Sequence, residues 1–311
     1  MKYGIPYKGS KSKIAKELID FLPKGERFVD LFGGGFAMSH CALLSRKYKQ
    51  VYYNDYNPLL KPLIEKAING YFNYDKFKPE FISREMFEKL KNKDGYIKYI
   101  WSFGNNGRDY LFGKDVEKYK KLAHNAVVFR DKDSLKELLE IVPSLKFDSN
   151  DIKSSRLNLR QAVRIDTPHL TRGEREQLQQ LQQLERLQQL QQLKHLERLE
   201  RLELNSSSYK DYVYRKGDIV YCDPPYEFSG QYDEKFDSLG FYDWVYNSTF
   251  PIYFSSYKIS DKRFHKIWEK DVRTTLSASS NNVKRSECLY TNDSGLEIRT
   301  PQVKYTTKKL F

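Results

Sequence analysis

The chain has 311 residues, which is enough for one sizeable core together with a second lobe or a large insertion. Its 54 Lys and Arg residues against 41 Asp and Glu give a net charge of +13, which favours a polyanionic partner, because neutralising phosphates releases counterions. The chain has no apolar signal region and no stretch of about 18 apolar residues, and its three cysteines are scattered, so we expect a reducing cytoplasmic compartment and neither secretion nor membrane spanning.

The first 70 residues alternate between helical and strand patterns. The predicted elements are a helix over 12–22, a strand over 28–32, a helix over 36–48, a strand over 51–55 and a helix over 59–69. Later strands are predicted over 218–222 and 251–255, and the tail over 273–309 is rich in Thr, Ser and Tyr, which suggests short strands or a closing hairpin. A strand, a glycine turn, a helix and a second strand form a βαβ unit, so an α/β fold with a parallel sheet is predicted.

Residues 71–175 differ from the flanking sequence because they are polar, aromatic and basic. Rings alternate there with cations and amides, a composition that suits the stacking and phosphate contacts of nucleic-acid binding. The residues that carry this pattern are Tyr96, Lys98, Tyr99, Trp101, Phe103, Arg108, Tyr110 and Phe112.

A leucine-rich triplet repeat follows over residues 177–204, with leucine at every third position from Leu178 to Leu202. Each step of three lags an α-helical turn by roughly 60°, so the leucines of one long helix would wrap around it. A coiled coil requires alternating steps of three and four, which are absent. A small β-solenoid fits the period, whereas local propensity favours α-helix, and both alternatives stay open. In either form we expect a separately packed insert that the chemistry of the rest of the chain does not require.

The most informative residues are Asp223, Pro224, Pro225 and Tyr226, which directly follow a predicted strand. The exocyclic amine of a base is a poor nucleophile, and two acceptors for its hydrogens would make it more reactive. Asp223 and the carbonyl of Pro224 can supply them, because the prolines hold the backbone extended. Tyr226 offers a ring for stacking on a flipped base. The alternative, a proline turn that ends a strand, stays open for this tetrapeptide alone.

A second group of residues lies between the first two predicted strands and at the end of the second. Gly33, Gly34 and Gly35 open a helix and allow close approach of a ligand, but they form neither a G-x-G-x-x-G pattern nor a phosphate-binding loop. This weighs against nicotinamide dinucleotides and nucleoside triphosphates. Asp55 ends the next strand, where a carboxylate can bind both hydroxyls of a ribose.

With these residues in this order, the chain resembles the Dam-type family of adenine-N6 DNA methyltransferases, from a phage or a bacterium. The resemblance covers residues 3–70 and about 215–300. The matching segments are 7–11, 28–36, 51–60, 220–226, 241–244, 253–257 and 287–292.

The resemblance implies a Rossmann-like methyltransferase sheet, a helical target-recognition lobe and the triplet-repeat insert. It assigns 1–70 and 205–311 to an S-adenosylmethionine-binding catalytic domain, 71–175 to the lobe and 176–204 to the insert. Double-stranded DNA is the implied partner, and a flipped adenine is the methyl acceptor. Asp223, Pro224, Pro225 and Tyr226 are the implied catalytic element. The implied cofactor-binding residues are Tyr7, Lys11, Asp30, Phe32, Gly33, Gly35, Asp55 and Asp223.

Other functions remain as alternatives. A methyltransferase of RNA adenine, of cytosine N4 or of a glutamine amide would use a related motif, but the cytosine and glutamine enzymes usually carry Ser or Asn in place of Asp223. A non-catalytic DNA-binding protein could retain the fold. The five histidines are dispersed and none lies beside the motif, so no metal site is expected. The recognised DNA sequence, the oligomeric state and a role in restriction–modification stay open.

Overall fold

The computed structural model describes residues 2–74, 77–146, 151–169, 181–226, 236–273 and 284–299. Two compact units make up the chain. Unit 1 comprises Met1–Gly4, Ser10–Lys61 and Glu197–Phe311, and unit 2 comprises Ile5–Gly9 and Pro62–Leu196. No described helix has the length and apolar character needed to cross a membrane.

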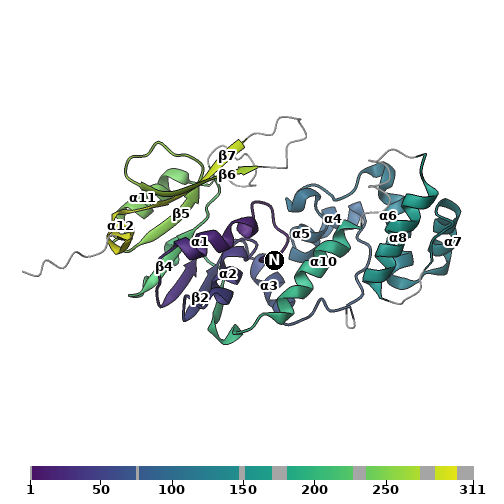
Figure 1. The fold of residues 1–311 in the computed structure, drawn as a ribbon, viewed down its shortest axis with the longest axis horizontal. Helices are drawn as coiled ribbons and strands as arrows, with labels where there is room; N and C mark the ends of the chain where they lie inside the picture. The colour runs from purple at the N-terminus through teal and green to yellow at the C-terminus, as the bar shows by residue number, and fades with distance from the viewer. Residues whose placement is uncertain are drawn as a thin grey trace, which may run out of the picture. The chain divides into compact units, whose positions relative to one another are not determined.

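Unit 1 is built on a seven-stranded sheet in the order β3-β2-β1-β4-β5-β7-β6 (Figure 1). The strands are β1 (Arg27–Asp30), β2 (Gln50–Asn54), β3 (Leu202–Asn205), β4 (Asp218–Cys222), β5 (Ile252–Ser256), β6 (His265–Arg273) and β7 (Lys284–Thr291). The first five strands are mutually parallel, and β7 runs antiparallel to both β5 and β6. The predicted α/β class, the βαβ unit and the Rossmann-like sheet are confirmed.

Every residue of β1, β4 and β5 is buried, as expected for parallel strands covered on both faces. Three of these residues, Arg27, Asp30 and Asp218, are charged, and two of them pair with each other. Arg27 donates to both carboxylate oxygens of Asp218, from Nε to Oδ1 at 2.9 Å and from Nη2 to Oδ2 at 2.8 Å. The two residues start adjacent strands in register, so the pairing satisfies both charges at the edge opposite the strands' carboxyl ends.

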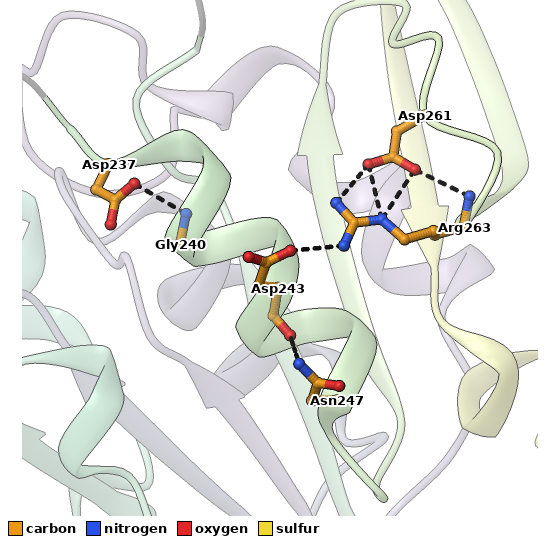
Figure 2. Close-up of polar contacts among 6 residues, drawn as sticks. All are labelled: Asp237, Gly240, Asp243, Asn247, Asp261 and Arg263. Carbon is orange, nitrogen blue, oxygen red and sulfur yellow. Dashed lines mark hydrogen bonds and ion pairs between the residues drawn. The ribbon is translucent and has the colours of Figure 1, made fainter.

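The helices predicted over 12–22, 36–48 and 59–69 are present, with ends shifted by a few residues, as α1 (Ala15–Phe21), α2 (Ala37–Ser45) and α3 (Leu60–Ile68), the last of which spans the boundary with unit 2. The other helical elements of unit 1 are η1 (Lys11–Lys13), η4 (Leu199–Arg201), η5 (Tyr209–Asp211), α11 (Ser238–Asn247) and α12 (Asp293–Arg299), of which α11 and α12 were not predicted. Hydrogen bonds at both ends hold α11 in place (Figure 2). Asp237 accepts from the backbone N–H of Gly240, and Arg263 joins Asp243 of this helix to Asp261.

The predicted closing hairpin exists, but its first strand lies earlier than the tail over 273–309 in which it was expected. The strand β6 ends where the predicted tail begins, β7 lies inside that tail, and α12 follows as a helix that was not predicted. Residues 274–283 and 300–309 of the predicted tail lie outside the described residues.

Unit 2 is helical in its described residues, which confirms a helical lobe (Figure 1). Its helical elements are α4 (Arg84–Leu90), α5 (Gly95–Ile100), η2 (Phe103–Asn105), α6 (Lys114–Phe129), α7 (Lys132–Ile141), α8 (Ile152–Asp166), α10 (Gln182–Gln192) and η3 (Leu193–His195). Side chains from α6, α7 and α8 form one buried cluster with Leu181 and Leu184 of the repeat.

The described part of the repeat is an α-helix followed by 3₁₀ turns and a strand, so the β-solenoid is wrong for residues 181–204. Within the 11 residues of α10, Leu184, Leu187 and Leu190 span only about 120°, a width that one buried face can accommodate. The chain then continues in 3₁₀ turns, which have about three residues per turn. Because this period matches the spacing of the leucines, Leu193 stays buried. Residues 177–180 lie outside the described residues.

The repeat does not form a core of its own, in contrast to the separately packed insert that was expected. Leu187 and Leu190 are 0 % exposed inside unit 2, and the last triplet enters β3 at the edge of the sheet in unit 1. The physical reason is that one short helix cannot bury a leucine face against itself and must pack against other elements.

Candidate active site

Three carboxylates gather at the carboxyl ends of three adjacent strands of unit 1. Asp30 ends β1, Asp55 directly follows β2, and Asp223 directly follows β4. The strand β1 lies between β2 and β4, so the chain order reverses at this point of the sheet. Ligands of open α/β sheets bind in the crevice at such a switch point. The structure therefore brings together the three acidic residues that the sequence predicted.

Asp223 is held by two donors on the same oxygen. Lys11 Nζ lies 2.8 Å from Oδ1, and the hydroxyl of Tyr226 donates to Oδ1 at 3.0 Å. Among the described residues, none donates to Oδ2 of Asp223. One oxygen is thus fixed by the protein, and the other remains as an acceptor for a ligand.

Glu287 on β7 completes this group, and no role was predicted for it. Its Oε1 lies 3.2 Å from Lys11 Nζ and accepts a hydrogen bond from the Tyr226 hydroxyl. Its side chain is 8 % exposed, and its register partner in the sheet is Lys270 of the antiparallel strand β6. The sequence offered one signal, since Glu287 begins a segment that resembles the family, but its partners are 61 and 276 positions away along the chain.

The charges of this group shift the pKa values of its members in a consistent direction. Burial lowers the pKa of Lys11, but the carboxylates of Asp223 and Glu287 outweigh burial and raise it above its usual range, so the ammonium stays charged. The pKa of Asp223 is raised, first by burial and then by the charge of Glu287, while Lys11 opposes the rise.

Asp55 and the glycine turn form a second part of the site. The two carboxylate oxygens of Asp55 each accept a hydrogen bond from one backbone N–H at 2.8 Å, Oδ2 from Gly34 and Oδ1 from Asn57. Burial raises the pKa of Asp55 to about 6, and these two hydrogen bonds oppose the rise. At Gly33 the backbone passes the Tyr53 ring so closely that a Cβ would lie 2.2 Å from a ring carbon, which explains the glycine.

Asp30 is the most deeply buried of the three carboxylates, at 1 % exposure. Its Oδ2 accepts from the Ser39 hydroxyl at 2.7 Å, whereas Oδ1 is buried and has no hydrogen-bond partner among the described residues. Burial raises the pKa of Asp30 to about 7, and the charges of Asp223 and Asp55 contribute to the rise. An unsatisfied buried acceptor beside two other carboxylates suits a cationic ligand that carries N–H donors.

The remaining predicted residues lie in different surroundings. Phe32 packs within an aromatic group that includes Tyr209 and Phe241, with ring centroids at 5.1 and 5.5 Å. Gly35 lies in the turn before α2, and Pro224 and Pro225 separate Asp223 from Tyr226. Tyr7 belongs to unit 2, where its ring lies 5.2 Å from that of Tyr99.

Two further observations limit the chemistry of the site. The described part of the chain contains no group of three or more His, Cys, Asp or Glu side chains that could hold a metal ion. The three cysteines are buried free thiols, and burial raises the pKa of Cys222 well above its usual range. The groups that the site offers to a substrate are therefore carboxylate acceptors, one buried ammonium and a tyrosine hydroxyl.

Sequence comparison connects this geometry with a known family. No curated protein matches the chain. A family profile described as D12 class N6 adenine-specific DNA methyltransferase matches residues 7–267, which is most of the 311-residue chain and includes β1, β2, β4 and Asp223. The chain belongs to the D12 class of N6 adenine-specific DNA methyltransferases and is an enzyme that methylates adenine in DNA.

Proposed function

We propose that the enzyme takes its methyl group from S-adenosylmethionine and transfers it to the N6 amine of an adenine flipped out of double-stranded DNA. One observation carries the catalytic part of this proposal. Asp223 keeps Oδ2 available while Lys11 and Tyr226 hold Oδ1, so the carboxylate can accept a hydrogen from the amine in a fixed orientation. The carbonyl of Pro224 is the proposed second acceptor, and the Tyr226 ring the proposed stacking surface for the base.

The surroundings of the three carboxylates support S-adenosylmethionine as the cofactor. This molecule carries a positive sulfonium, an ammonium and a ribose, and when bound it supplies an activated methyl group. Asp55 uses only two of its four acceptor positions on backbone N–H groups, so two remain for ribose hydroxyls. The unsatisfied Oδ1 of Asp30 suits the ammonium. The turn over Gly33–Gly35 allows close approach, and Phe32, Tyr7 and Lys11 stay in the proposed cofactor-binding set on the strength of the resemblance.

Unit 1 is the proposed catalytic domain and unit 2 the proposed target-recognition lobe. The exposed Phe103 and the cations of unit 2 support this assignment, because rings and positive charge together bind nucleic acid. The order of the glycine turn, the lobe and then Asp223 supports the Dam-type subgroup. We further propose a bacterial or phage origin, action in the bacterial cytoplasm where the DNA lies, and a role in restriction–modification or phage DNA protection.

Calorimetric titration of the purified protein with S-adenosylmethionine tests the cofactor, and Asp55→Ala is the diagnostic variant. A ribose contact remote from the methyl group should affect ground and transition states similarly. We therefore expect Asp55→Ala to raise the cofactor KM at least tenfold while changing kcat less than threefold. Detection of N6-methyladenine in a DNA duplex, but not in RNA of the same sequence, tests the substrate. Unchanged cofactor affinity in the variant, or preference for RNA, would refute the corresponding part of the proposal.

A further inference from the structure

Arg186 lies in the triplet repeat, on α10, and its side chain makes hydrogen bonds that the packing of the leucines does not explain. Its Nη1 donates to two backbone carbonyls of another element, Ile100 O at 2.6 Å and Ser102 O at 2.7 Å. It forms no ion pair with the described residues, and burial lowers its pKa to about 10, which leaves it charged at neutral pH. A half-buried cation that binds two carbonyls fixes the position of the backbone that carries them.

Those carbonyls lie at the base of a tight loop formed by residues 102–110. Ser102 and Tyr110 pair as an isolated antiparallel bridge and close the loop, and the Ser102 hydroxyl accepts the N–H of Gly107 at 2.9 Å. Three residues of the loop have positive φ angles, namely Gly104 at 57°, Asn105 at 57° and Gly107 at 71°. A loop with so many left-handed residues depends on fixed ends to keep one conformation.

The 102–110 loop carries side chains with the chemistry of nucleic-acid contact. Phe103 is 61 % exposed, so its ring is open to a ligand. The pKa of Lys8 is lowered by burial and then by the charge of Arg108, which therefore lies near it. The Nε of Arg108 is buried and has no hydrogen-bond partner among the described residues. A loop that carries an exposed ring and a cation can stack on a base and bind phosphate.

We propose that Arg186 is a positioning residue for target recognition: through the carbonyls of Ile100 and Ser102, it fixes the loop that contacts DNA. The inference rests on the proposed role of unit 2 as the recognition lobe, and it gives the triplet repeat a task beyond packing. Arg186 itself does not touch DNA. Its effect on binding passes through the geometry of residues 102–110.

The test compares the full-length wild type with Arg186→Met, which keeps the length and removes the donors, and with Arg186→Lys, which restores a charged donor. Arg164→Gln, at an exposed position of α8, is the control for the loss of one positive charge. Arg186→Gln is the second variant if methionine prevents folding. The measurements are hydrogen–deuterium exchange of the peptide over 101–112, duplex affinity as a function of salt, and S-adenosylmethionine affinity.

We expect Arg186→Met, or Arg186→Gln in its place, to exchange faster over 101–112 and to bind the recognised duplex at least tenfold more weakly. Cofactor affinity should change less than twofold, and Arg186→Lys should recover most of the duplex affinity. Because a positioning residue releases no counterions, the slope of log affinity against log salt should stay the same.

Several results would overturn the inference. A salt slope lowered by about one would show that Arg186 binds phosphate directly. Faster loop exchange with unchanged duplex affinity would show that the loop does not serve DNA binding. Unchanged exchange and unchanged affinity would show that Arg186 does not position the loop. A wild-type protein that binds no duplex would instead refute the proposed function itself, and is recognised without any variant.

Discussion

Replacement of Asp223 by asparagine preserves the shape of the side chain and removes one acceptor at a defined place. Lys11 Nζ and the Tyr226 hydroxyl both donate to Oδ1. The amide must therefore turn its oxygen toward these two donors, which leaves its NH₂ group at the position of Oδ2. A donor then faces the N–H groups of the target amine where an acceptor stood before.

The size of the effect follows from this reversal. Removal of one preorganised hydrogen-bonding group from a transition state costs about 2.7–4 kcal/mol, or roughly 10²–10³ in rate. The reversed amide adds a repulsive contact, so we expect Asp223→Asn to lower the rate of methyl transfer by at least about 10³-fold, the upper limit of that range. The fold should survive, because Lys11 retains the carboxylate of Glu287 at 3.2 Å and is not left as an unpaired buried charge.

Single-turnover methylation of a duplex at saturating cofactor measures the chemical step alone. Asp211→Asn is the matched control, because this carboxylate is exposed in η5 and belongs to neither the proposed catalytic nor the proposed cofactor-binding set. Thermal unfolding and cofactor titration verify that the variant is folded and loaded. If Asp223→Asn retained more than a tenth of the wild-type rate, Asp223 would not be the acceptor of the amine hydrogen.

Three further variants test the electrostatics of the site and the packing of the repeat. Glu287→Gln should move the acid limb of the pH–rate profile to lower pH, because Asp223 accepts only when ionised and its pKa is raised by burial and by the charge of Glu287; an unmoved limb would contradict this. Asp30→Asn should flatten the pH dependence of stability. Folding raises the pKa of Asp30 from 3.8 to about 7, so the folded protein binds the proton of this carboxyl more tightly than the unfolded chain does. The resulting stabilisation, up to about 4 kcal/mol, is complete below about pH 4 and is lost as the pH rises through about 7. Urea unfolding at several pH values measures this contribution. Equal slopes of the unfolding free energy against pH for the wild type and Asp30→Asn would refute the raised pKa. Leu187→Ala should destabilise the protein by about 2–5 kcal/mol, whereas Leu199→Ala, at 36 % exposure, should cost much less; equal losses in urea unfolding would argue against a buried role for the repeat.

The central strands β1, β4 and β5 of unit 1 were predictable because they are buried on both faces and lie in apolar runs. The pattern over 218–222 predicted β4 with both of its ends correct, and the glycine turn predicted the change from β1 to α2. The position of the hairpin was harder to predict. Residues 265–273 are mostly polar or charged and carry only Ile267, Trp268 and Val272 as apolar side chains, so only their pairing with β7 makes them a strand.

The site was predicted where its residues follow strands, and missed where it depends on pairing between distant segments. Asp55 and Asp223 each stand at the end of an apolar run, which indicated the carboxyl edge of the sheet, whereas Asp30 lies inside the run over 28–32 and was expected only from the resemblance. Glu287 lies inside a strand whose neighbour is set by an antiparallel register with β5. A single sequence does not reveal such a register, and the ion pair of Glu287 with Lys11 could not be derived from spacing.

The triplet repeat shows that a period must be interpreted together with a length. A lag of about 60° for each triplet excludes one long helix for nine leucines, but it permits a helix of three turns, and α10 is of that size. After Gln192 the chain continues in a 3₁₀ turn, whose period equals that of the leucines. The polar positions between the leucines then become available for specific contacts, as Arg186 and Gln191 demonstrate with their bonds to backbone carbonyls of unit 2. A leucine at every third residue is thus compatible with an α-helix only while the leucines remain on its buried face. The α-helix ends where further leucines would point toward solvent.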